Sequence, residues 1–392
     1  MIQISDKTQC CGCSSCAQRC PKMCITMVQD EEGFSYPQVD AATCIDCGLC
    51  EIVCPILNHK QAHEPIQIFA AKNPNEAIRK ESSSGGIFTM LAEDVIHEGG
   101  IVFGARWDKD WNVVHDFIDS LNYLNPREAL NRVNLFRGSK YVQSDINGSY
   151  QKAEDFLKVG RKVLFSGTPC QIAGLKSYLR KEYDNLLTVE CACHGVPSSG
   201  LWQKYLSEVT NGKSILSINH RDKRTGWRNY SVVIKFTPSE HSEQSKHSEL
   251  SDPHDDSPWT RAFIKNLTLR PSCHQCAFKT FKSQADITFA DLWGDKTLMP
   301  EQNEDKGITL VIARSHKAAE LLKNVKSIKD FTLRDVVPFN GALVIPAKQN
   351  PRRLEFMSRL QKGESFSKVV KTMTKDPFFL RMKIMINKMI RK

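Results

Sequence analysis

The sequence predicts a protein of the α+β or α/β class, in which a mixed α/β body follows a small cysteine-rich N-terminal domain. Two observations carry this prediction. Ten of the fifteen cysteines lie between Cys10 and Cys54, and from residue 65 onward short apolar runs alternate with helical patterns. The 392 residues suffice for two or three domains with a sizeable core, at roughly 150 residues per domain.

Composition places the chain among soluble globular proteins. Apolar residues make up 41% and charged residues 25% of the chain, values that disfavour disorder, collagen-like repetition and a membrane-embedded body. The first ten residues have no signal-peptide pattern, and nowhere do about 18 apolar residues follow one another. We therefore expect a cytoplasmic, reducing compartment, where crowded cysteines are metal ligands or redox centres before they are disulfides.

One cysteine spacing occurs twice in the N-terminal domain. Both copies have the form Cys-x-x-Cys-x-x-Cys-x-x-x-Cys-Pro, beginning at Cys10 and at Cys44. This run holds 4Fe–4S clusters in bacterial ferredoxins, where the fourth cysteine of each run binds the other cluster. We therefore predict one cluster on Cys10, Cys13, Cys16 and Cys54, and a second on Cys44, Cys47, Cys50 and Cys20.

Residues 1–58 form a complete two-cluster ferredoxin domain in this interpretation. Between the two runs, residues 25–40 predict two short strands around a turn at Asp30–Gly33. A pair of zinc sites is the alternative, although zinc modules usually show two Cys-x-x-Cys pairs or mixed Cys and His ligands. Cys11 and Cys24 lie outside the repeated pattern and are expected to pack rather than to bind iron.

The body is expected to divide at two places. Residues 59–64 form a polar linker after the ferredoxin domain, and a boundary near residues 144–148 precedes a helix-plus-strand unit. The predicted parts of the body are therefore residues 65–148 and 149–340, followed by a helical C-terminal tail over 341–392. Strands and helices alternate through both parts, which favours a mixed α/β architecture.

Two loops of the body carry chemical signals. The run Ser82-Ser83-Ser84-Gly85-Gly86 directly precedes an apolar-periodic helix, where serine would cap the helix and glycine would let a phosphate approach bare N–H groups. The turn Gly167-Thr168-Pro169 joins a predicted strand to a helix, and Cys170 follows near the first turn, where the helix dipole favours a thiolate. An ordinary helix cap and a small buried hydrophobic side chain are the respective alternatives.

Cysteines of the body indicate a third metal site. Cys191 and Cys193 lie on one face of a predicted strand, and Cys273 and Cys276 form one Cys-x-x-Cys pair in an irregular stretch. Together with Cys170, these residues make five thiols for a site that needs four.

The order and spacing of several motifs resemble the beta subunits of coenzyme F420 (deazaflavin) hydrogenases and dehydrogenases, in the bacterial branch with a fused two-cluster ferredoxin. The resemblance covers nearly the whole chain. It is carried by the two cysteine runs and by SSSGG at 82–86, RGSKYVQS at 137–144, SGTPCQ at 166–171, CHGVPS at 193–198, RDKRTGW at 221–227, RPSCHQC at 270–276 and DITFADLWG at 286–294.

This resemblance implies an iron–sulfur flavoprotein in which a cluster in the body exchanges electrons with FAD. It implies that the third 4Fe–4S cluster is held by Cys170, Cys193, Cys273 and Cys276, with Cys191 left as packing. It also implies that FAD is bound by Ser83, Ser84, Gly85, Gly86, Lys140, Gly167, Thr168, Pro169 and Gln171.

The same resemblance assigns catalytic roles to two residues. Lys140 would face the flavin or its phosphates, and His194 would relay protons beside the flavin. An exposed lysine and a hydrogen-bonded structural histidine are the alternatives. A further cluster of basic residues would bind an acidic substrate, and an ordinary solvated surface is the alternative. This basic group consists of Arg221, Lys223, Arg224 and Arg228.

The resulting functional prediction is an oxidoreductase. Electrons enter at the ferredoxin domain, pass through the body cluster to FAD and leave as a hydride to an organic acceptor, or travel in reverse. Its partners would be a redox protein such as a ferredoxin and a small-molecule donor or acceptor. The substrate stays open, because ferredoxin-fused bacterial chains of this kind also resemble those found among genes for surface-polysaccharide synthesis.

Two other classes of function compete with this prediction. The first is a non-catalytic electron-transfer subunit whose flavin serves a separate catalytic partner. The second is a zinc-stabilised nucleic-acid binder that uses the net charge of +10, but the chain lacks interleaved aromatic residues and any recognisable nucleic-acid-binding motif. We therefore expect no nucleic-acid partner.

The end of the chain predicts an amphipathic helix. Over residues 380–392, apolar side chains recur at helical spacing and the basic side chains lie mainly off that stripe. Such a helix would suit peripheral contact with the inner face of an anionic membrane, and packing on the protein's own body is the alternative.

Overall fold

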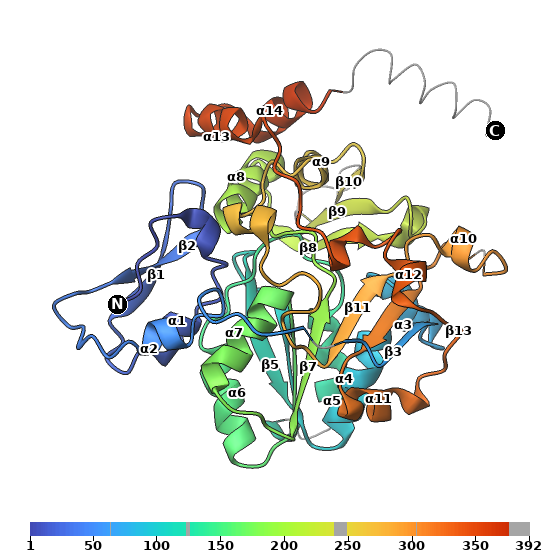
Figure 1. Ribbon diagram of the computed structural model, residues 1–392. Coiled ribbons are helices and arrows are strands. Elements are labelled where there is room, and N and C mark those ends of the chain that lie inside the picture. Colours follow the sequence, from blue (N-terminus) through green and yellow to red (C-terminus); the bar gives the residue numbers. More distant parts are fainter. Residues whose placement is uncertain (63, 123–125, 239–248, 303, 376–392) are drawn as a thin grey trace.

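The structure is a computed structural model, and it describes residues 1–62, 64–122, 126–238, 249–302 and 304–375. Its centre is an eight-stranded sheet (Figure 1) in the order β13-β3-β12-β11-β7-β6-β4-β5. The strands are β3 (Gln67–Ala71), β4 (Ile101–Trp107), β5 (Val113–Asp119), β6 (Val163–Gly167), β7 (Leu186–Cys191), β11 (Ile287–Asp291), β12 (Thr309–Ala313) and β13 (Lys329–Asp330).

The sheet is mixed. Strands β4, β6, β7 and β11 run parallel to their neighbours within this group, while β5 is antiparallel to β4 and β12 is antiparallel to both β11 and β3. Strand β12 is buried along its whole length, and its sequence TLVIA lacks the alternation of a strand with one face in water. The predicted mixed α/β class is confirmed.

Helices cover both faces of the sheet. On one face, α4 (Ile87–His97) packs Ile87, Leu91 and Val95 against Val102 and Leu164 of the strands. On the other face, α6 (Ser149–Lys158) and α7 (Pro169–Leu179) pack against the alternate strand residues, among them Phe103 and Phe165. The period-two alternation along β4 and β6 therefore supplies two separate cores.

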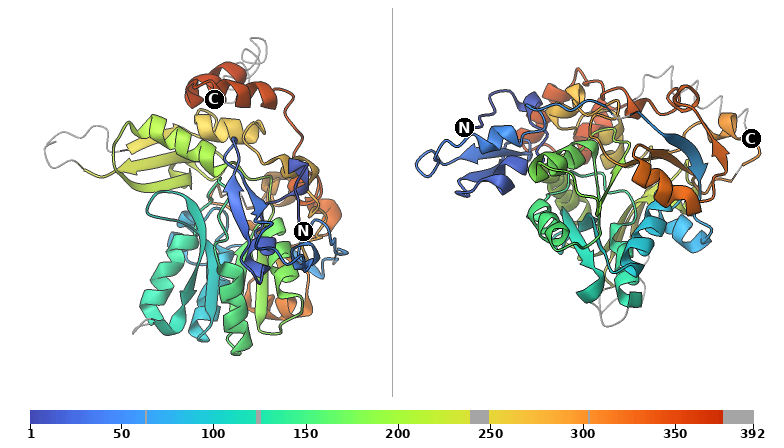
Figure 2. Two further views of the ribbon diagram at one scale, coloured as in Figure 1. Left: turned by 90° about the vertical axis from the view of Figure 1, so that its left-hand side faces the viewer. Right: turned by 60° about the horizontal axis from the view of Figure 1, so that its bottom comes forward.

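A smaller layer lies beyond the main sheet, as Figure 2 shows. Strands β8 (Ile215–Asp222), β9 (Ser231–Phe236) and β10 (Glu249–Pro253) form an antiparallel sheet. Its core is rich in aromatic residues, with Trp202, Tyr205, Trp259 and Phe366 in mutual ring contact. These residues come from α8 (Ser199–Thr210), α9 (Pro258–Ile264) and α14 (Phe366–Met373), and α13 (Arg353–Gln361) completes the layer.

The remaining helices are short. They are α1 (Ser15–Arg19), α2 (Leu49–Ile52), α3 (Glu76–Glu81), α5 (Pro126–Arg132), α10 (Asp295–Leu298), α11 (His316–Leu321) and α12 (Leu333–Val336). Helices α13 and α14 lie within the predicted tail and pack into the aromatic core. The amphipathic helix predicted over residues 380–392 lies outside the described residues.

The N-terminal residues form a small lobe beside α6 and α7 (Figures 1 and 2), hereafter the head, residues 1–58. Strands β1 (Ile25–Gln29) and β2 (Ser35–Val39) pair antiparallel around the predicted turn. Asp30 organises that turn, because its backbone C=O accepts from Gly33 N and its carboxylate accepts from Phe34 N. Phe34 is 1% exposed, so this hairpin is anchored by burial as well as by hydrogen bonds.

Candidate functional site

The outer part of the head holds one group of thiols. Cys20, Cys44, Cys47 and Cys50 line a single pocket, although Cys20 precedes the other three by more than twenty residues. Cys47 is exposed, so this pocket opens to solvent. We call this group the distal thiols. Their convergence is the crossover that the two cysteine runs predict.

The inner part of the head holds the second group. Cys10, Cys13, Cys16 and Cys54 lie close enough for their charges to interact, and Cys13 and Cys16 are buried. Burial raises the pKa of Cys16 above its ordinary range and that of Cys54 to about 11. We call this group the proximal thiols, because they lie against the body.

A third group lies in the body, at the carboxyl ends of the parallel strands. Cys170, Cys193, Cys273 and Cys276 line one pocket, although they come from three segments far apart in the chain. Cys170 is in the first turn of α7, and Cys193 follows β7 by two residues. Cys273 lies in a 3-10 turn, Pro271–Gln275, and Cys276 follows that turn directly. We call this group the body thiols.

Burial favours the neutral form of two of the body thiols. Burial raises the pKa of Cys273 to about 12 and that of Cys193 well above the ordinary value, because a thiolate there loses its hydration. A metal binds the thiolate and displaces the proton, so metal binding at this site would release protons. All fifteen cysteines are free of disulfides.

No three Cys, His, Asp or Glu side chains among the described residues are gathered tightly enough to hold a single metal ion. A four-iron cubane is larger than one ion, so its thiolates lie further apart than the ligands of a zinc ion.

Two cysteines differ in position from what their sequence context indicates. Cys11 lines the pocket of the body thiols, and its thiol contacts both Cys13 of the head and Cys170 of the body. This contact lowers the pKa of Cys13 to about 6 and also lowers the pKa of Cys170. Cys191, also expected to pack, is instead exposed and does not line this pocket. The fifth thiol at the body site is therefore Cys11, a head residue expected only to pack.

Cys24 also lies beside a predicted ligand. Its thiol is 3.3 Å from that of Cys20, and it lines the pocket of the distal thiols. No sequence signal distinguishes Cys24 from an ordinary buried cysteine, because it falls outside both runs.

His194 lies in the wall of the body-thiol pocket. Its Nε2 is 2.6 Å from Asn266 Oδ1, its ring packs edge-on against Phe263, and burial lowers its pKa. The hydrogen bond commits one ring nitrogen to a structural partner. This arrangement is that of the structural histidine which the sequence left as the alternative.

The loop 82–86 differs in detail from the predicted cap. No side chain caps α4; its N-cap is Gly86, with a φ of +85°, while Ser82 donates instead to Ile78 O at the end of α3. Gly85 packs so tightly that a Cβ would lie 2.6 Å from Ala71 O, and its N–H is already bonded to Thr309 Oγ1. The first turn of α4 therefore keeps N–H groups without a side-chain partner.

The segment that carries Lys140 lies against this loop. Ser139 Oγ donates to Ser83 Oγ at 2.8 Å, which joins the 137–144 motif to the 82–86 motif. Lys140 is half-buried and donates to the carbonyls of Arg137 and Gly138. Burial lowers the pKa of Lys140 to about 7.

The turn at the end of β6 is rigid. Thr168 and Gln171 form a capping box at the start of α7, with Thr168 N donating to Gln171 Oε1. His115 holds this turn in place through two hydrogen bonds of its ring. Its Nε2 lies 2.9 Å from Ser166 O, and its Nδ1 lies 2.9 Å from Ser144 Oγ. Pro169 lines the body-thiol pocket, so the turn forms part of the pocket wall.

The basic group at 221–228 is engaged internally. Arg221 pairs with Asp291, Arg228 with Asp295 and Asp305, and Arg224 with Asp222 and Glu249.

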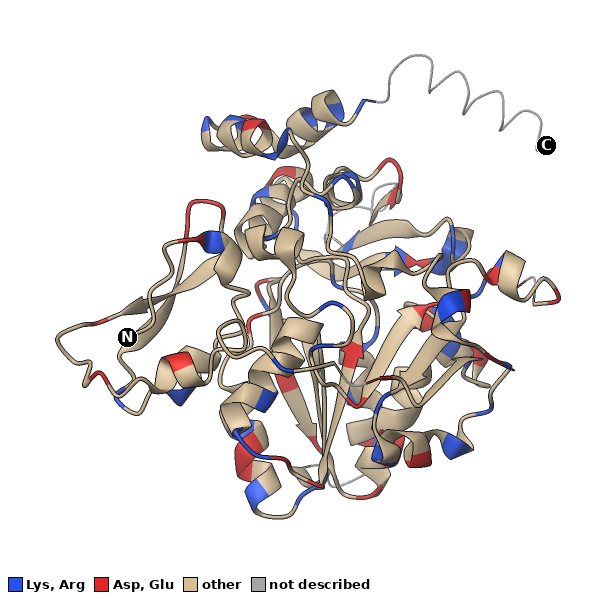
Figure 3. Cartoon of the chain, in the orientation of Figure 1, with Lys and Arg blue, Asp and Glu red and all other residues tan. Residues whose placement is uncertain are grey.

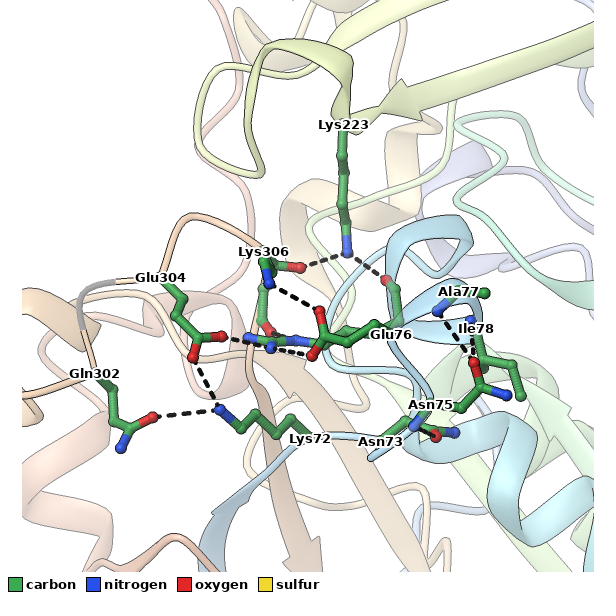
Figure 4. A network of polar contacts seen from close by, with 12 residues as sticks. Lys72, Asn73, Asn75, Glu76, Ala77, Ile78, Lys223, Gln302, Glu304 and Lys306 are labelled. Carbon is green, nitrogen blue, oxygen red and sulfur yellow. Dashed lines mark hydrogen bonds and ion pairs between the residues drawn. The ribbon is translucent and has the colours of Figure 1, made fainter.

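Lys223 of this group reaches into the network of Figure 4, where its ammonium donates to carbonyls of Arg79, Ser84 and Lys306. In the same network, Arg79 pairs with Glu76 and Glu304. Lys223 therefore fastens the loop before α4 to the segment before β12.

Comparisons with known proteins bear on the body first. Residues 160–338 match the family described as the C terminus of the beta subunit of coenzyme F420 hydrogenase/dehydrogenase. This region of the chain, residues 160–338, belongs to that family. This match includes all four body thiols, the turn at the end of β6 and the basic group.

Two further likenesses were found. A 43-residue stretch is 44% identical to a 7Fe ferredoxin of Hydrogenibacillus schlegelii; it makes up 11% of this chain and about half, 49%, of that ferredoxin. A chain of the F420-reducing [NiFe] hydrogenase complex from Methanosarcina barkeri aligns with a TM-score of 0.44 at 17% identity, over 79% of this chain and 92% of that one. The ferredoxin likeness and the clustered cysteines support 4Fe–4S clusters in this chain.

None of the described helices combines the length and the apolar character that crossing a bilayer requires.

Proposed function

We propose that this protein is an iron–sulfur flavoprotein oxidoreductase in which three 4Fe–4S clusters connect an electron-transfer partner to FAD. One observation carries this proposal. Thr8, Cys11 and Ile56 of the head line the same pocket as the four body thiols, so head and body share one site. A ferredoxin tethered only by a flexible linker would not contribute to the wall of the body's own pocket.

The three thiol groups support a linear route. The distal thiols open to solvent, the proximal thiols lie between, and the body thiols lie at the edge of the main sheet. Cys11 contacts one proximal and one body thiol, so the last step crosses a packed junction rather than water. Electrons arriving singly at the distal cluster would pass inward along this order, or outward for the reverse reaction.

The FAD site is proposed at the 82–86 and 137–144 motifs. The uncapped first turn of α4 offers N–H groups and a positive dipole end to a phosphate, and the half-buried Lys140 lies on the motif joined to that loop. The capping-box turn at Gly167–Gln171 would border the flavin on the side of the body cluster, because it is also part of the cluster pocket. We assign His194 to the cluster pocket rather than to proton relay.

FAD would supply the change from one-electron to two-electron chemistry. Two electrons from the clusters and one proton from solvent balance a hydride, which an organic acceptor would receive. We infer that this acceptor is a small organic molecule, with a deazaflavin and a substrate of surface-polysaccharide synthesis as the two classes to test.

The electron donor would be a redox protein that docks on the head. Residues 1–58 carry seven Asp and Glu against three Lys and Arg, although the whole chain has a net charge of +10 (Figure 3). Ile45 and Met23 are exposed near the distal thiols, which gives the head an apolar patch inside an acidic surface. A partner with basic residues around its own cofactor would be steered to this surface.

The experiment follows electrons through the full-length protein. Anaerobically reconstituted protein, loaded with FAD, is mixed with a reduced ferredoxin, and flavin bleaching is followed by stopped flow. We expect Cys170→Ser, which removes a body ligand, to slow bleaching strongly, while Cys191→Ser bleaches at the wild-type rate. Equal rates in Cys170→Ser and wild type, or the absence of bound flavin in the wild type, would overturn the proposal.

A non-catalytic electron-transfer subunit is the second candidate. It is favoured by the internal ion pairs of Arg221, Arg224 and Arg228, which leave no obvious receptor for an acidic substrate in that group. Reduced protein alone, incubated with deazaflavin, nicotinamides and nucleotide sugars, distinguishes the candidates. Reoxidation by one of these molecules identifies an enzyme, and inertness toward all of them favours the subunit.

A further inference from the structure

Arg270 joins the head to the segments that carry the body thiols. Its backbone N–H donates to Val196 O, and its own C=O accepts from Cys273 N at 2.9 Å. The residue before it, Leu269, forms a bridge with Pro197. The backbone of Arg270 is therefore fixed between the turn after Cys193 and the turn that contains Cys273.

The side chain of Arg270 reaches from this position into the head. Nε donates to Cys10 O at 2.7 Å and one terminal nitrogen donates to Ser35 O at 2.9 Å. The same terminal nitrogen lies 3.6 Å from Cys10 Sγ, a proximal thiol. The guanidinium also lies over the Tyr36 ring, 4.3 Å from its centroid.

The fit around this side chain is tight. A Cβ on Gly12 would lie 2.7 Å from one guanidinium nitrogen, so the loop between Cys10 and Cys13 approaches Arg270 as closely as a glycine allows. Gln143 completes the set, with Oε1 accepting from Arg270 at 3.1 Å. Arg270 is 1% exposed, and water therefore does not solvate its charge.

Arg270 differs from the other buried arginines in its partners. Four of the five described arginines that are buried have a carboxylate partner: Arg79 with Glu304, Arg221 with Asp291, Arg314 with Glu190 and Arg353 with Glu32. Among the described residues, no carboxylate forms an ion pair with Arg270. Its acceptors are backbone carbonyls, one amide oxygen and one thiol.

A buried cation without a counter-ion is costly, so the chain is expected to supply one in its working state. A 4Fe–4S cluster on four thiolates is an anion and gains one further negative charge on reduction. The proximal thiols hold such a cluster in the function proposed above, on which this inference rests. The guanidinium lies at the sulfur of one of its ligands.

We propose that Arg270 is the charge partner of the proximal cluster and raises its reduction potential relative to the distal cluster. A fixed positive charge in a water-poor site stabilises the reduced, more negative cluster, as does a hydrogen bond to a ligand sulfur. The distal pocket offers no equivalent buried cation. Its cations are the exposed Lys22 and the N-terminal ammonium of Met1, which is already paired with Asp46 and Glu51. Electrons would therefore settle on the cluster nearest the body. Arg270 is a positioning residue in this account.

Two variants test the charge from opposite directions. Arg270→Gln removes the cation. Gln143→Glu keeps Arg270 and places a carboxylate where Oε1 now accepts its hydrogen bond, which gives the cation an internal counter-ion. The matched control is Arg353→Gln, because Arg353 also ties the head to the body from a buried site but directs its guanidinium to Glu32 and Leu269 O rather than to a thiol.

The measurement is an EPR-monitored redox titration of reconstituted full-length protein, with iron content determined on the same samples. We expect Arg270→Gln and Gln143→Glu each to lower the potential of one head cluster and to leave the other head cluster unchanged, with iron retained. Arg353→Gln should leave both potentials at their wild-type values. Arg270→Lys, which keeps the charge but loses the forked hydrogen bonds, should fall between wild type and Arg270→Gln.

Unchanged potentials in Gln143→Glu with full iron would overturn the inference, and so would an equal shift in the Arg353→Gln control. If Arg270→Gln fails to assemble, Gln143→Glu still decides, since it leaves the arginine in place. A wild-type protein without two head clusters would instead refute the proposed function.

Discussion

Ser15 of the head donates a hydrogen bond to Gly174 O of the body at 2.7 Å. Ser15 begins α1, two residues after Cys13, and Gly174 lies one turn after Cys170 in α7. This single contact therefore joins the helix that carries the proximal thiol Cys16 to the helix that carries the body thiol Cys170 in its first turn. Gly174 permits the approach, because a Cβ there would lie 2.8 Å from both Cys13 Cβ and Tyr150 OH.

The first prediction concerns this close approach. Replacing glycine by alanine inside a helix normally stabilises the folded protein by roughly 1 kcal/mol. At Gly174 the new methyl group would overlap with Cys13 and Tyr150, which costs about 1–3 kcal/mol. We expect Gly174→Ala to lower the thermal midpoint by roughly 2–4 °C, measured by calorimetry on reconstituted protein. Gly148→Ala is the matched control, since nothing lies within 4 Å of its Cβ position. A midpoint for Gly174→Ala at or above that of the control would show that the junction is loose.

The second prediction concerns the ligands of the body cluster. Cys170→Ser and Cys273→Ser should each lower the iron content by about four per chain, from about twelve, because a cubane needs all four thiolates. Cys191→Ser and Cys11→Ser should retain the full iron content. Cys191 lies outside the pocket, and Cys11 lies in it but is not needed, because the four body thiols already supply the four ligands. Iron and sulfide analysis measures the effect. A loss of about four iron in Cys11→Ser would make Cys11 a ligand.

The third prediction concerns Lys140 and pH. Burial lowers the pKa of Lys140 to about 7, so its positive charge is present below that value and is lost as the pH rises through it. A phosphate bound beside the ammonium favours the charged form and moves the transition upward. We expect the FAD affinity to fall between about pH 7 and pH 9 in the wild type, measured by flavin fluorescence.

The control for this pH effect is a change at an exposed lysine of the same part of the chain. Lys140→Gln should bind FAD weakly with a flat pH profile, whereas Lys152→Gln should follow the wild type. Parallel profiles for Lys140→Gln and the wild type would remove Lys140 from the flavin site.

The fourth prediction concerns His115, which supports the turn at the end of β6. Burial lowers its pKa to about 4 from an ordinary value near 6.5, so the unfolded chain takes up this proton before the folded chain does. Stability from His115 is therefore complete above about pH 6.5 and decreases as the pH falls toward 4, by up to about 3 kcal/mol.

Thermal midpoints of the wild type and His115→Gln between pH 7 and pH 5 measure this effect. The advantage of the wild type should shrink as the pH falls, because only the wild type loses the contribution of His115. An advantage that stays constant over this range would mean that His115 titrates with an ordinary pKa.

The sequence predicted the head well because its information is local. The two cysteine runs and the turn at Asp30 lie within short stretches, and the structure gathers Cys20 with the run that starts at Cys44. The mixed α/β class followed in the same way from strand and helix periodicity. The turn and the periodicity depend on residues that are near one another in the chain, whereas the approach of Cys20 to the second run follows from the crossover typical of this cysteine spacing.

The junction could not be predicted from the sequence, because it depends on docking of the head against the body. Cys11 is adjacent to Cys10, and only the docked structure turns its thiol toward Cys170. Arg221 and Arg228 resembled a substrate receptor, but their carboxylate partners lie 67 to 77 residues further along the chain. Gly85 and Gly86 suggest a phosphate loop, but the sequence does not show that Gly85 is also required by close packing on β3 and β12.

In the proposed function, the head and body thiols hold three clusters in one electron-transfer route. Spin quantification by EPR, on fully reduced full-length protein after anaerobic reconstitution, tests this route at all three clusters at once. We expect about three spins per chain, with broadening from magnetic interaction between the body cluster and the proximal cluster that disappears in Cys170→Ser. Two spins per chain, or a third spin whose spectrum is unaffected by the head, would contradict the route.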